Sequence, residues 1–285
     1  MLLDGGEPLL RKDLTEIIRY AVRVGVTPHL STNGLLLDCK TVKKLRKAGL
    51  QSIQVSLDGA FSETHNFIRG YSESYDSAIA AIQNARQGGL SVTVNTVLMK
   101  HNIKEIPGII NLLIKMKVDF YRVASIVPVN ETLKKLCVST QEFKDLLSFL
   151  VKSKRQIRDN LQIILPSNKL VYILDEKADS NIMLSTSLTS NIGCEAGTFL
   201  CNITPDGWVT PCVYFSEEQF RAGNIRREKL ASIWSKSPIF RAFRNLKLAR
   251  KCMGCSYLMK CKGGCRALAF YFFGSLKEQD PRCWI

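Results

Sequence analysis

Short apolar segments alternate with amphipathic segments through the N-terminal half of the chain, and this rhythm restricts the fold more than any other feature. Each apolar segment ends in a polar turn, and the segment after the turn has helical periodicity. The strands predicted in this way are residues 1–3, 27–31, 52–56, 91–99 and 119–127. Because strand, turn and helix repeat in this order, the sequence predicts parallel strands joined by crossover helices. The predicted fold class is α/β, with a spacing that suits a parallel barrel or part of one.

Other local signals mark where helices begin. Asp38 is expected to cap a helix that runs to Ala48, and Ser139 with Glu142 forms a capping box before a later helix. The inward side of that later helix is predicted to be Phe143, Leu146, Leu147, Leu150 and Val151. Helices are also expected near 76–86, after a long loop, and over 106–116.

From about residue 160 the rhythm fades. Residues 161–165 and 171–174 are candidate strands, Asp206-Gly207 predicts the turn of a hairpin, and residues 230–248 predict a helix. We therefore expect two domains. Residues 1–185 contain the parallel sheet and a linker, and residues 186–285 form a smaller cysteine-rich domain.

Eight of the ten cysteines fall between residues 194 and 283. They are Cys194, Cys201, Cys212, Cys252, Cys255, Cys261, Cys265 and Cys283. Short gaps between thiolates are what a metal ion or an iron-sulfur cluster requires, because short loops must bring several sulfurs to one centre. Zinc-ribbon ligands and buried thiols are the alternatives, whereas Cys39 and Cys137 stand alone and are predicted to be ordinary thiols. The three histidines have no ligand spacing.

The charge and hydropathy of the chain indicate whether it binds nucleic acid or a membrane. The formal net charge is +15, but Lys and Arg are spread along the chain without interleaved aromatic residues, which favours a solvated surface over a nucleic-acid site. The densest basic run is predicted to lie on the exposed side of a helix; it consists of Lys152, Lys154, Arg155 and Arg158. The sequence has no apolar run of membrane-spanning length and no recognisable signal peptide, so we expect a cytoplasmic protein that does not bind a membrane.

Three of the predicted strands end in short polar motifs. These are GGEP at residues 5–8, STNG at 31–34 and SLDG at 56–59, and HNFIRG follows at 65–70. In parallel α/β folds, ligands bind at the edge where the carboxyl ends of the strands meet. Together with the cysteine spacing, these motifs resemble the radical S-adenosylmethionine (SAM) enzymes that carry a C-terminal SPASM extension. The resemblance covers nearly the whole chain and implies a partial (β/α) barrel, lacking its first strand, followed by a small SPASM domain.

The resemblance implies a SAM site. Its residues would be Gly5, Gly6, Glu7, Ser56, Arg69 and Asn95. The GGEP residues would take the amino group, Ser56 and Arg69 the carboxylate, and Asn95 the ribose. A guanidinium and a hydroxyl suit a carboxylate. The alternatives are a Ser56 hydroxyl bonded to its own turn and a surface ion pair of Arg69.

The resemblance also implies two auxiliary 4Fe-4S clusters. One would be held by Cys194, Cys201, Cys212 and Cys265, and the other by Cys252, Cys255, Cys261 and Cys283. The motif does not require Cys201.

Two departures from the family pattern affect the activity that we expect. Residues 1–285 contain no CxxxCxxC segment, the loop that holds the SAM-cleaving cluster in the family. We therefore expect a truncated sequence, a misassigned start, a cluster supplied by another chain or a non-catalytic remnant, and in each case no SAM cleavage by these residues alone. Val213 follows Cys212 where sulfatase-maturing relatives have an acidic residue, which argues against that reaction.

In complete form, such an enzyme would cleave SAM reductively and abstract a hydrogen atom from its substrate. The GGCRA run at residues 263–267 and the DPRC ending are similar to members that modify tetrapyrrole side chains and to peptide-cofactor maturases. The expected partners are thus a tetrapyrrole or a peptide substrate and an electron donor, and no nucleic acid. Two rival hypotheses are a non-catalytic iron-sulfur partner or scaffold and a zinc-stabilised nucleic-acid binder.

Overall fold

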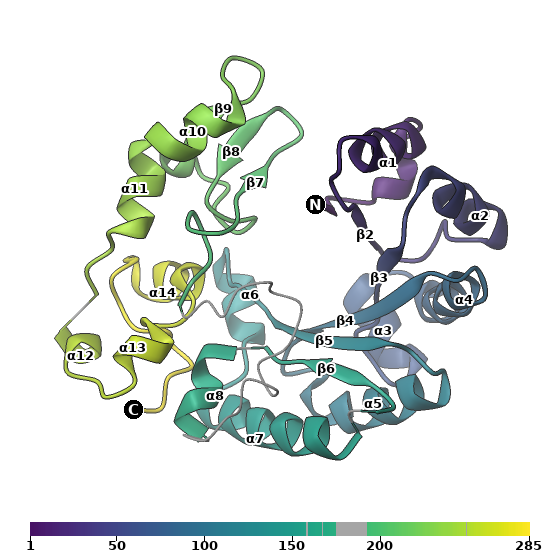
Figure 1. Ribbon diagram of the computed structural model, residues 1–285. Helices are drawn as coiled ribbons and strands as arrows, with labels where there is room; N and C mark the ends of the chain where they lie inside the picture. Colours follow the sequence, from purple (N-terminus) through teal and green to yellow (C-terminus); the bar gives the residue numbers. More distant parts are fainter. Residues whose placement is uncertain (158, 167, 175–192, 249) are drawn as a thin grey trace. The chain divides into compact units, whose positions relative to one another are not determined.

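The computed structural model describes residues 1–157, 159–166, 168–174, 193–248 and 250–285. These residues form two compact units, each built from two stretches of the chain (Figure 1). The first, which we call the sheet unit, comprises Met1–Ile126 and Leu146–Pro166. The second, the cysteine unit, comprises Val127–Asp145 and Ser167–Ile285. The predicted domain boundary between residues 185 and 186 lies outside the described residues.

The sheet unit contains a six-stranded parallel sheet in the order β1-β2-β3-β4-β5-β6. Its strands are β1 (Leu2–Leu3), β2 (His29–Thr32), β3 (Ser52–Ser56), β4 (Ser91–Leu98), β5 (Phe120–Ser125) and β6 (Gln162–Ile164). Because strand order follows chain order, every connection is a crossover between neighbours. The predicted α/β class and the parallel sheet are confirmed.

Helices connect the strands. They are η1 (Pro8–Leu10), α1 (Leu14–Arg23), α2 (Cys39–Ala48), α3 (Ser62–Arg69), α4 (Ser74–Gln87), η2 (Ile103–Glu105) and α5 (Ile106–Lys115), and α7 (Thr140–Ile157) precedes β6. Asp38 caps α2 by accepting a hydrogen bond from the Thr41 amide, and the capping box of Ser139 and Glu142 forms. The prediction of a loop before α4 was wrong, because part of it forms α3. Only His65 of that helix is buried, so the sequence shows no apolar stripe there.

The two faces of the sheet differ in polarity. One face consists of residues that are almost completely buried: Leu30, Ile53, Val55, Val92, Val94, Tyr121, Val123 and Ile163. Helix α4 contacts β3 and β4. The residues that alternate with them are mainly polar and include Ser31, Gln54, Ser56, Thr93, Asn95 and Arg122. Parallel sheets covered on both sides are apolar on both faces, so this polar face has the character of a surface that meets water or a ligand.

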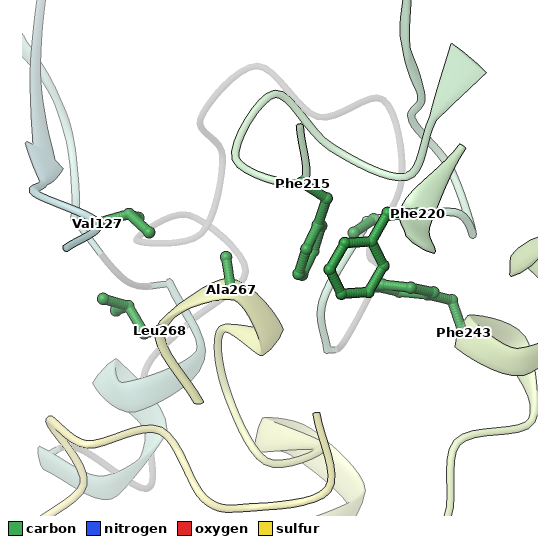
Figure 2. Close-up of a cluster of buried hydrophobic side chains, with 7 residues drawn as sticks. Val127, Phe215, Phe220, Phe243, Ala267 and Leu268 are labelled. Atoms are coloured by element: carbon green, nitrogen blue, oxygen red, sulfur yellow. The ribbon is translucent and has the colours of Figure 1, made fainter. Parts of the chain in front are cut away.

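The cysteine unit consists of short elements. Its helices are α6 (Glu131–Leu136), α8 (Asn168–Leu174), η3 (Glu218–Phe220), α10 (Leu230–Lys236), α11 (Pro238–Arg244), α12 (Arg250–Met253), α13 (Leu258–Cys261) and α14 (Arg266–Phe273), together with the start of α7. An antiparallel sheet joins β7 (Asn202–Ile203), β8 (Trp208–Thr210) and β9 (Gly223–Asn224), with the predicted hairpin turn at Asp206-Gly207. Figure 2 shows its main apolar cluster, in which Phe215, Phe220 and Phe243 pack together.

Three further predictions need correction. The helix predicted over 230–248 is two helices, because Pro238 begins a new one at α11. Residues 171–174 belong to α8 and not to a strand; a four-residue apolar run does not distinguish the two. Lys154 is buried rather than exposed, because it follows Val151 by three residues on the inward stripe of α7. Burial lowers the pKa of Lys154. No helix in the described ranges combines the length and apolarity needed to cross a membrane.

Candidate functional site

The predicted SAM residues of the sheet unit lie at the carboxyl edge of the sheet. Gly5 to Glu7 follow β1, and Ser56 is the last residue of β3. Asn95 of β4 pairs in register with Ser56, so the two are direct neighbours across the strands. Arg69 ends α3, the helix after β3. Since the strands are parallel, all these positions meet at one edge.

The Glu7 carboxylate joins the turns after β1 and β2. It accepts hydrogen bonds from the Thr32 hydroxyl at 2.8 Å, the Asn33 amide at 2.8 Å and the Leu9 amide at 3.1 Å. The last of these caps η1. A carboxylate has about four acceptor positions, so Glu7 has room for one more donor beside its structural bonds.

Gly5 and Gly6 leave the backbone of the GGEP turn uncovered. Gly5 has φ +144°, where a side chain is strained, whereas Gly6 has an ordinary φ. A Cβ atom added at Gly6 would meet no protein atom within 4 Å. In the part of the chain that the structure describes, no contact requires a glycine at residue 6.

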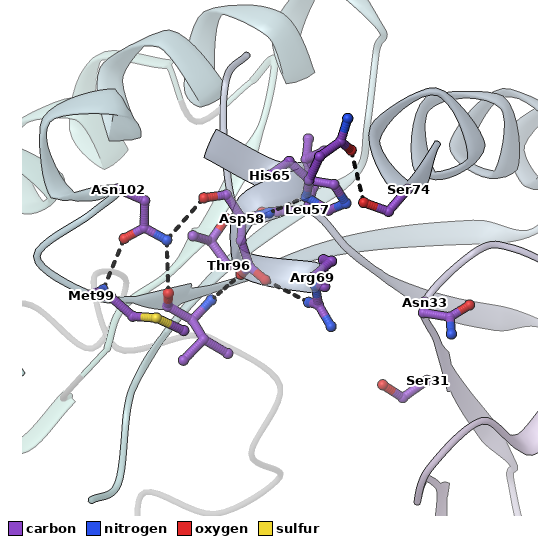
Figure 3. A network of polar contacts seen from close by, with 12 residues as sticks. Ser31, Asn33, Leu57, Asp58, His65, Arg69, Ser74, Thr96, Met99 and Asn102 are labelled. Atoms are coloured by element: carbon purple, nitrogen blue, oxygen red, sulfur yellow. Dashed lines mark hydrogen bonds and ion pairs between the residues drawn. The ribbon is translucent and has the colours of Figure 1, made fainter. Parts of the chain in front are cut away.

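Arg69 is held by a buried carboxylate, as Figure 3 shows. Its guanidinium contacts Asp58 at 2.7 Å, and Asp58 also accepts a hydrogen bond from the Val97 amide at 2.8 Å. His65, one helical turn before Arg69, accepts from the Asp58 amide through Nδ1 at 2.9 Å. The Arg69 Nε atom is buried without a hydrogen-bond partner in the described structure. A buried donor without a partner is costly, so the Arg69 side chain is held in this position by its ion pair with Asp58 rather than by full satisfaction of its own donors.

Burial dominates the electrostatics of this group. Burial and the neighbouring Arg69 charge lower the pKa of His65 to about 4, so the imidazole is neutral near pH 7. Burial raises the pKa of Asp58, although the Arg69 charge acts in the opposite direction. Sequence reasoning missed Asp58 and His65. The signal was present as the Asp of SLDG and the His-x₃-Arg spacing that puts both side chains on one side of α3.

The eight C-terminal cysteines divide into groups in the cysteine unit. Cys194, Cys212 and Cys265 all pack against the apolar cluster of Figure 2. Burial, together with charges on Cys194 and Cys265, raises the pKa of Cys212 to about 11. These three thiols therefore lie close enough to influence one another.

The other group is Cys252, Cys255, Cys261 and Cys283. Burial raises the pKa of Cys252 and that of Cys261, the latter to about 11. Charges on Cys283 and Cys255 contribute to the shift of Cys252, and charges on Asp280, Cys283 and Cys252 contribute to that of Cys261. Cys201 packs elsewhere, against the cluster of Val209, Ile233 and Phe240.

An ion pair supports the cysteine groups. Asp280 accepts from the Cys265 amide at 2.8 Å and contacts the Arg282 guanidinium at 2.6 Å. Burial by itself would raise the pKa of Asp280, but the Arg282 charge and hydrogen bonds hold it below its ordinary value. The Arg282 guanidinium also lies over the Phe143 ring at 4.7 Å. This pair fixes the backbone at Cys265 and at the chain end.

Comparison with known proteins identifies the family. A model of the radical SAM superfamily matches residues 2–113, and a model of an iron-sulfur cluster-binding domain, SPASM, matches residues 194–256. An AdoMet-dependent heme synthase of Methanosarcina barkeri is 32% identical over 99% of this chain and 81% of its own length. The chain belongs to the radical SAM superfamily.

Other radical SAM proteins match over nearly the full chain. The Fe-coproporphyrin III synthase of Methanosarcina barkeri is 28% identical over 100% of this chain and 75% of its own. The mycofactocin maturase MftC of Mycolicibacterium smegmatis is 27% identical over 99% and 69%. The solved structure of SuiB from Streptococcus suis has a TM-score of 0.79 at 22% identity, and the chain spans 66% of that structure. This likeness confirms the fold.

The radical SAM and SPASM domains imply SAM and 4Fe-4S clusters as cofactors. The donor set fits such clusters, because the grouped side chains are all thiols and each group is partly buried. No three His, Cys, Asp or Glu side chains in the described ranges converge tightly enough for a single metal ion. A four-iron cluster binds each thiolate to a different iron and so needs wider spacing than one ion does.

Proposed function

We propose that this chain supplies the SAM-binding edge and the auxiliary clusters of a radical SAM enzyme that modifies a tetrapyrrole side chain. The observation that carries the proposal is the 32% identity to an AdoMet-dependent heme synthase along almost the whole chain. The Fe-coproporphyrin III synthase match supports the same substrate class. When bound, SAM and its cluster supply a 5′-deoxyadenosyl radical that abstracts a hydrogen atom from the substrate.

The residues of the sheet edge bind and orient SAM in this proposal. The partly exposed Arg69 guanidinium and the Ser56 hydroxyl donate to the carboxylate of SAM, and Asp58 holds the guanidinium in place. The GGEP backbone, with the remaining acceptor position of Glu7, takes the amino group. Asn95, beside Ser56 on β4, contacts the ribose.

The cysteine unit holds the auxiliary clusters. Cys252, Cys255, Cys261 and Cys283 bind one cluster, and Cys194, Cys212 and Cys265 bind the other with Cys201 as fourth ligand. The electrostatic grouping of the thiols supports this division for every ligand except Cys201, which packs against a different apolar cluster and rests on the family resemblance alone. Thiols must lose their protons to bind iron, so loading at neutral pH releases protons from both groups.

The second candidate substrate is a peptide. The 27% identity to the mycofactocin maturase MftC favours it. In either case we propose that residues 1–285 by themselves do not cleave SAM, because they contain no CxxxCxxC segment.

The test uses an extended protein, in which a strand and a helix with a CxxxCxxC segment are joined to the N-terminus of this chain. The protein is reconstituted anaerobically and given dithionite, SAM and either a porphyrin with four propionates or a candidate precursor peptide. Mass spectrometry should find a changed mass for the porphyrin together with 5′-deoxyadenosine. A changed mass for the peptide alone would establish the second candidate, and stoichiometric zinc without iron would rule out both.

A further inference from the structure

Arg122 lies on the polar face of the sheet and has no role in the site described above. It is in β5, where it pairs in register with Asn95 of β4 and Ile164 of β6. Its side chain is exposed. No hydrogen bond or ion pair joins it to another residue of the described ranges. An inner strand of a large parallel sheet is an unusual position for an arginine whose charge is only solvated by water.

No acidic side chain on the strands faces Arg122. The strand residues that share its face are Leu2, His29, Ser31, Ser52, Gln54, Ser56, Ser91, Thr93, Asn95, Val97, Phe120, Ala124, Gln162 and Ile164. None of these carries a carboxylate. Among the residues of these strands the guanidinium therefore has no counterion, and the carboxylate of a ligand would complement its charge.

The surroundings of Arg122 are more apolar than the edge next to GGEP. Phe120 and Ala124 flank it along β5, and Val97 is the register partner of Ala124. With Ile164 on the other side, these residues give an apolar floor around one cation and the Asn95 amide. Sites of this kind suit a largely apolar ligand that carries a few fixed polar groups.

Register places Arg122 two strands away from Ser56, with Asn95 between them. Ser56, Asn95 and Arg122 occupy one row on three neighbouring strands. Because neighbouring strands are about 4.8 Å apart, Arg122 is roughly 10 Å from Ser56 along this row. Asn95 lies between the two, so the row leads from the residues proposed for SAM to a second anion position.

We infer that Arg122 binds a carboxylate of the substrate, and that this substrate is an apolar ring system with carboxylate side chains. The inference rests on the proposed tetrapyrrole function and names the residue that selects for it. An arginine is well suited to this task because its planar fork binds a carboxylate through two hydrogen bonds.

The test measures binding by reconstituted residues 1–285 of a metal-free porphyrin with four propionates and of its tetramethyl ester. Fluorescence titration should show tighter binding of the acid than of the ester. Arg122→Gln should weaken binding of the acid about tenfold or more, remove most of the preference over the ester and leave SAM affinity unchanged. Arg122→Lys should keep part of the preference. Arg19→Gln, which removes an exposed arginine from α1, is the matched control and should bind like the parent chain.

Three results would overturn the inference. Unchanged binding of the acid by Arg122→Gln would remove Arg122 from the substrate site and leave the proposed function intact. If Arg122→Gln instead loses affinity for SAM and keeps its affinity for the porphyrin acid, Arg122 belongs to the cofactor site. If the parent chain binds neither porphyrin, the tetrapyrrole function falls as well. Thermal unfolding of each variant serves as the folding check, since an exposed side chain should be replaceable without loss of stability.

Discussion

The two regions of this chain hold their candidate sites in different ways. In the sheet unit, a continuous parallel sheet fixes the positions of the site residues, and hydrogen bonds such as those of Glu7 and Asp58 tie neighbouring turns together. In the cysteine unit, strands of two or three residues and helices of four residues surround the thiols. Most of the eight thiols there lie between regular elements.

This difference predicts different dependence on cofactors. The geometry of the sheet edge follows from backbone register, so it should persist whether or not SAM is present. A unit of short elements with a small aromatic core has little else to stabilise it, so metal binding and folding should be coupled. The following predictions separate the two regions, beginning with the largest effect.

Loss of one cluster ligand should remove half of the iron. Reconstituted chain should carry about eight irons, the sum of two four-iron clusters, and Cys261→Ala should retain about four. Cys39→Ala is the control and should keep the full amount, because Cys39 lies on α2 of the sheet unit. Iron analysis that finds no difference between the two variants would contradict the division into two ligand sets.

Breaking the buried ion pair should destabilise the cysteine unit strongly. Asp280→Asn leaves the Arg282 charge buried and uncompensated, which costs about 3–5 kcal/mol in the free energy of unfolding. All three tryptophans are in this unit, so their fluorescence reports its unfolding.

The sheet unit provides a matched control for this substitution. Asp13→Asn breaks a pair of the same spacing with Arg11, but both side chains are well exposed. It should leave stability unchanged, because exposed pairs contribute little. Equal effects of the two substitutions would refute the burial argument.

His65 should make the sheet unit sensitive to acid. Its pKa is about 4 in the folded chain and about 6.5 when unfolded, so the unfolded state binds more protons between these values. The stability from neutral His65 is therefore complete above about pH 6.5 and is lost as the pH falls towards 4, with an upper bound of about 3 kcal/mol. His65→Asn keeps an acceptor for the Asp58 amide but does not titrate. Hydrogen exchange of β3 and β4 amides should show a weaker pH dependence in this variant; an identical profile would exclude His65 as the cause.

The smallest effect on stability is expected at Gly6. Gly6→Ala should unfold like the parent chain, because an added Cβ meets no atom of the described residues within 4 Å, while SAM affinity should fall about tenfold through contact with the ligand. Gly5→Ala should reduce stability as well, because its φ of +144° disfavours a side chain. Unchanged SAM affinity in Gly6→Ala would remove the GGEP turn from the site.

The sequence predicted correctly those positions that depend on the order of the strands. The positions of Glu7, Ser56 and Asn95 at one edge follow from parallel strands that each end in a polar turn. It failed where tertiary packing decides the structure. The helix at Ser62–Arg69 buries only a histidine, and Lys154 is buried despite its charge. Arg122 escaped notice because its place beside Asn95 is visible only in the register of β4 and β5.

The central claim is that these residues provide a SAM-binding edge and auxiliary clusters but not the cluster that cleaves SAM. The most direct measurement is the yield of 5′-deoxyadenosine from reconstituted residues 1–285 with dithionite and SAM, beside the same chain extended at its N-terminus by a CxxxCxxC segment. Four-thiolate clusters leave no iron open to SAM, so the account predicts no product from residues 1–285 and turnover from the extended chain. Turnover by residues 1–285 alone would contradict it.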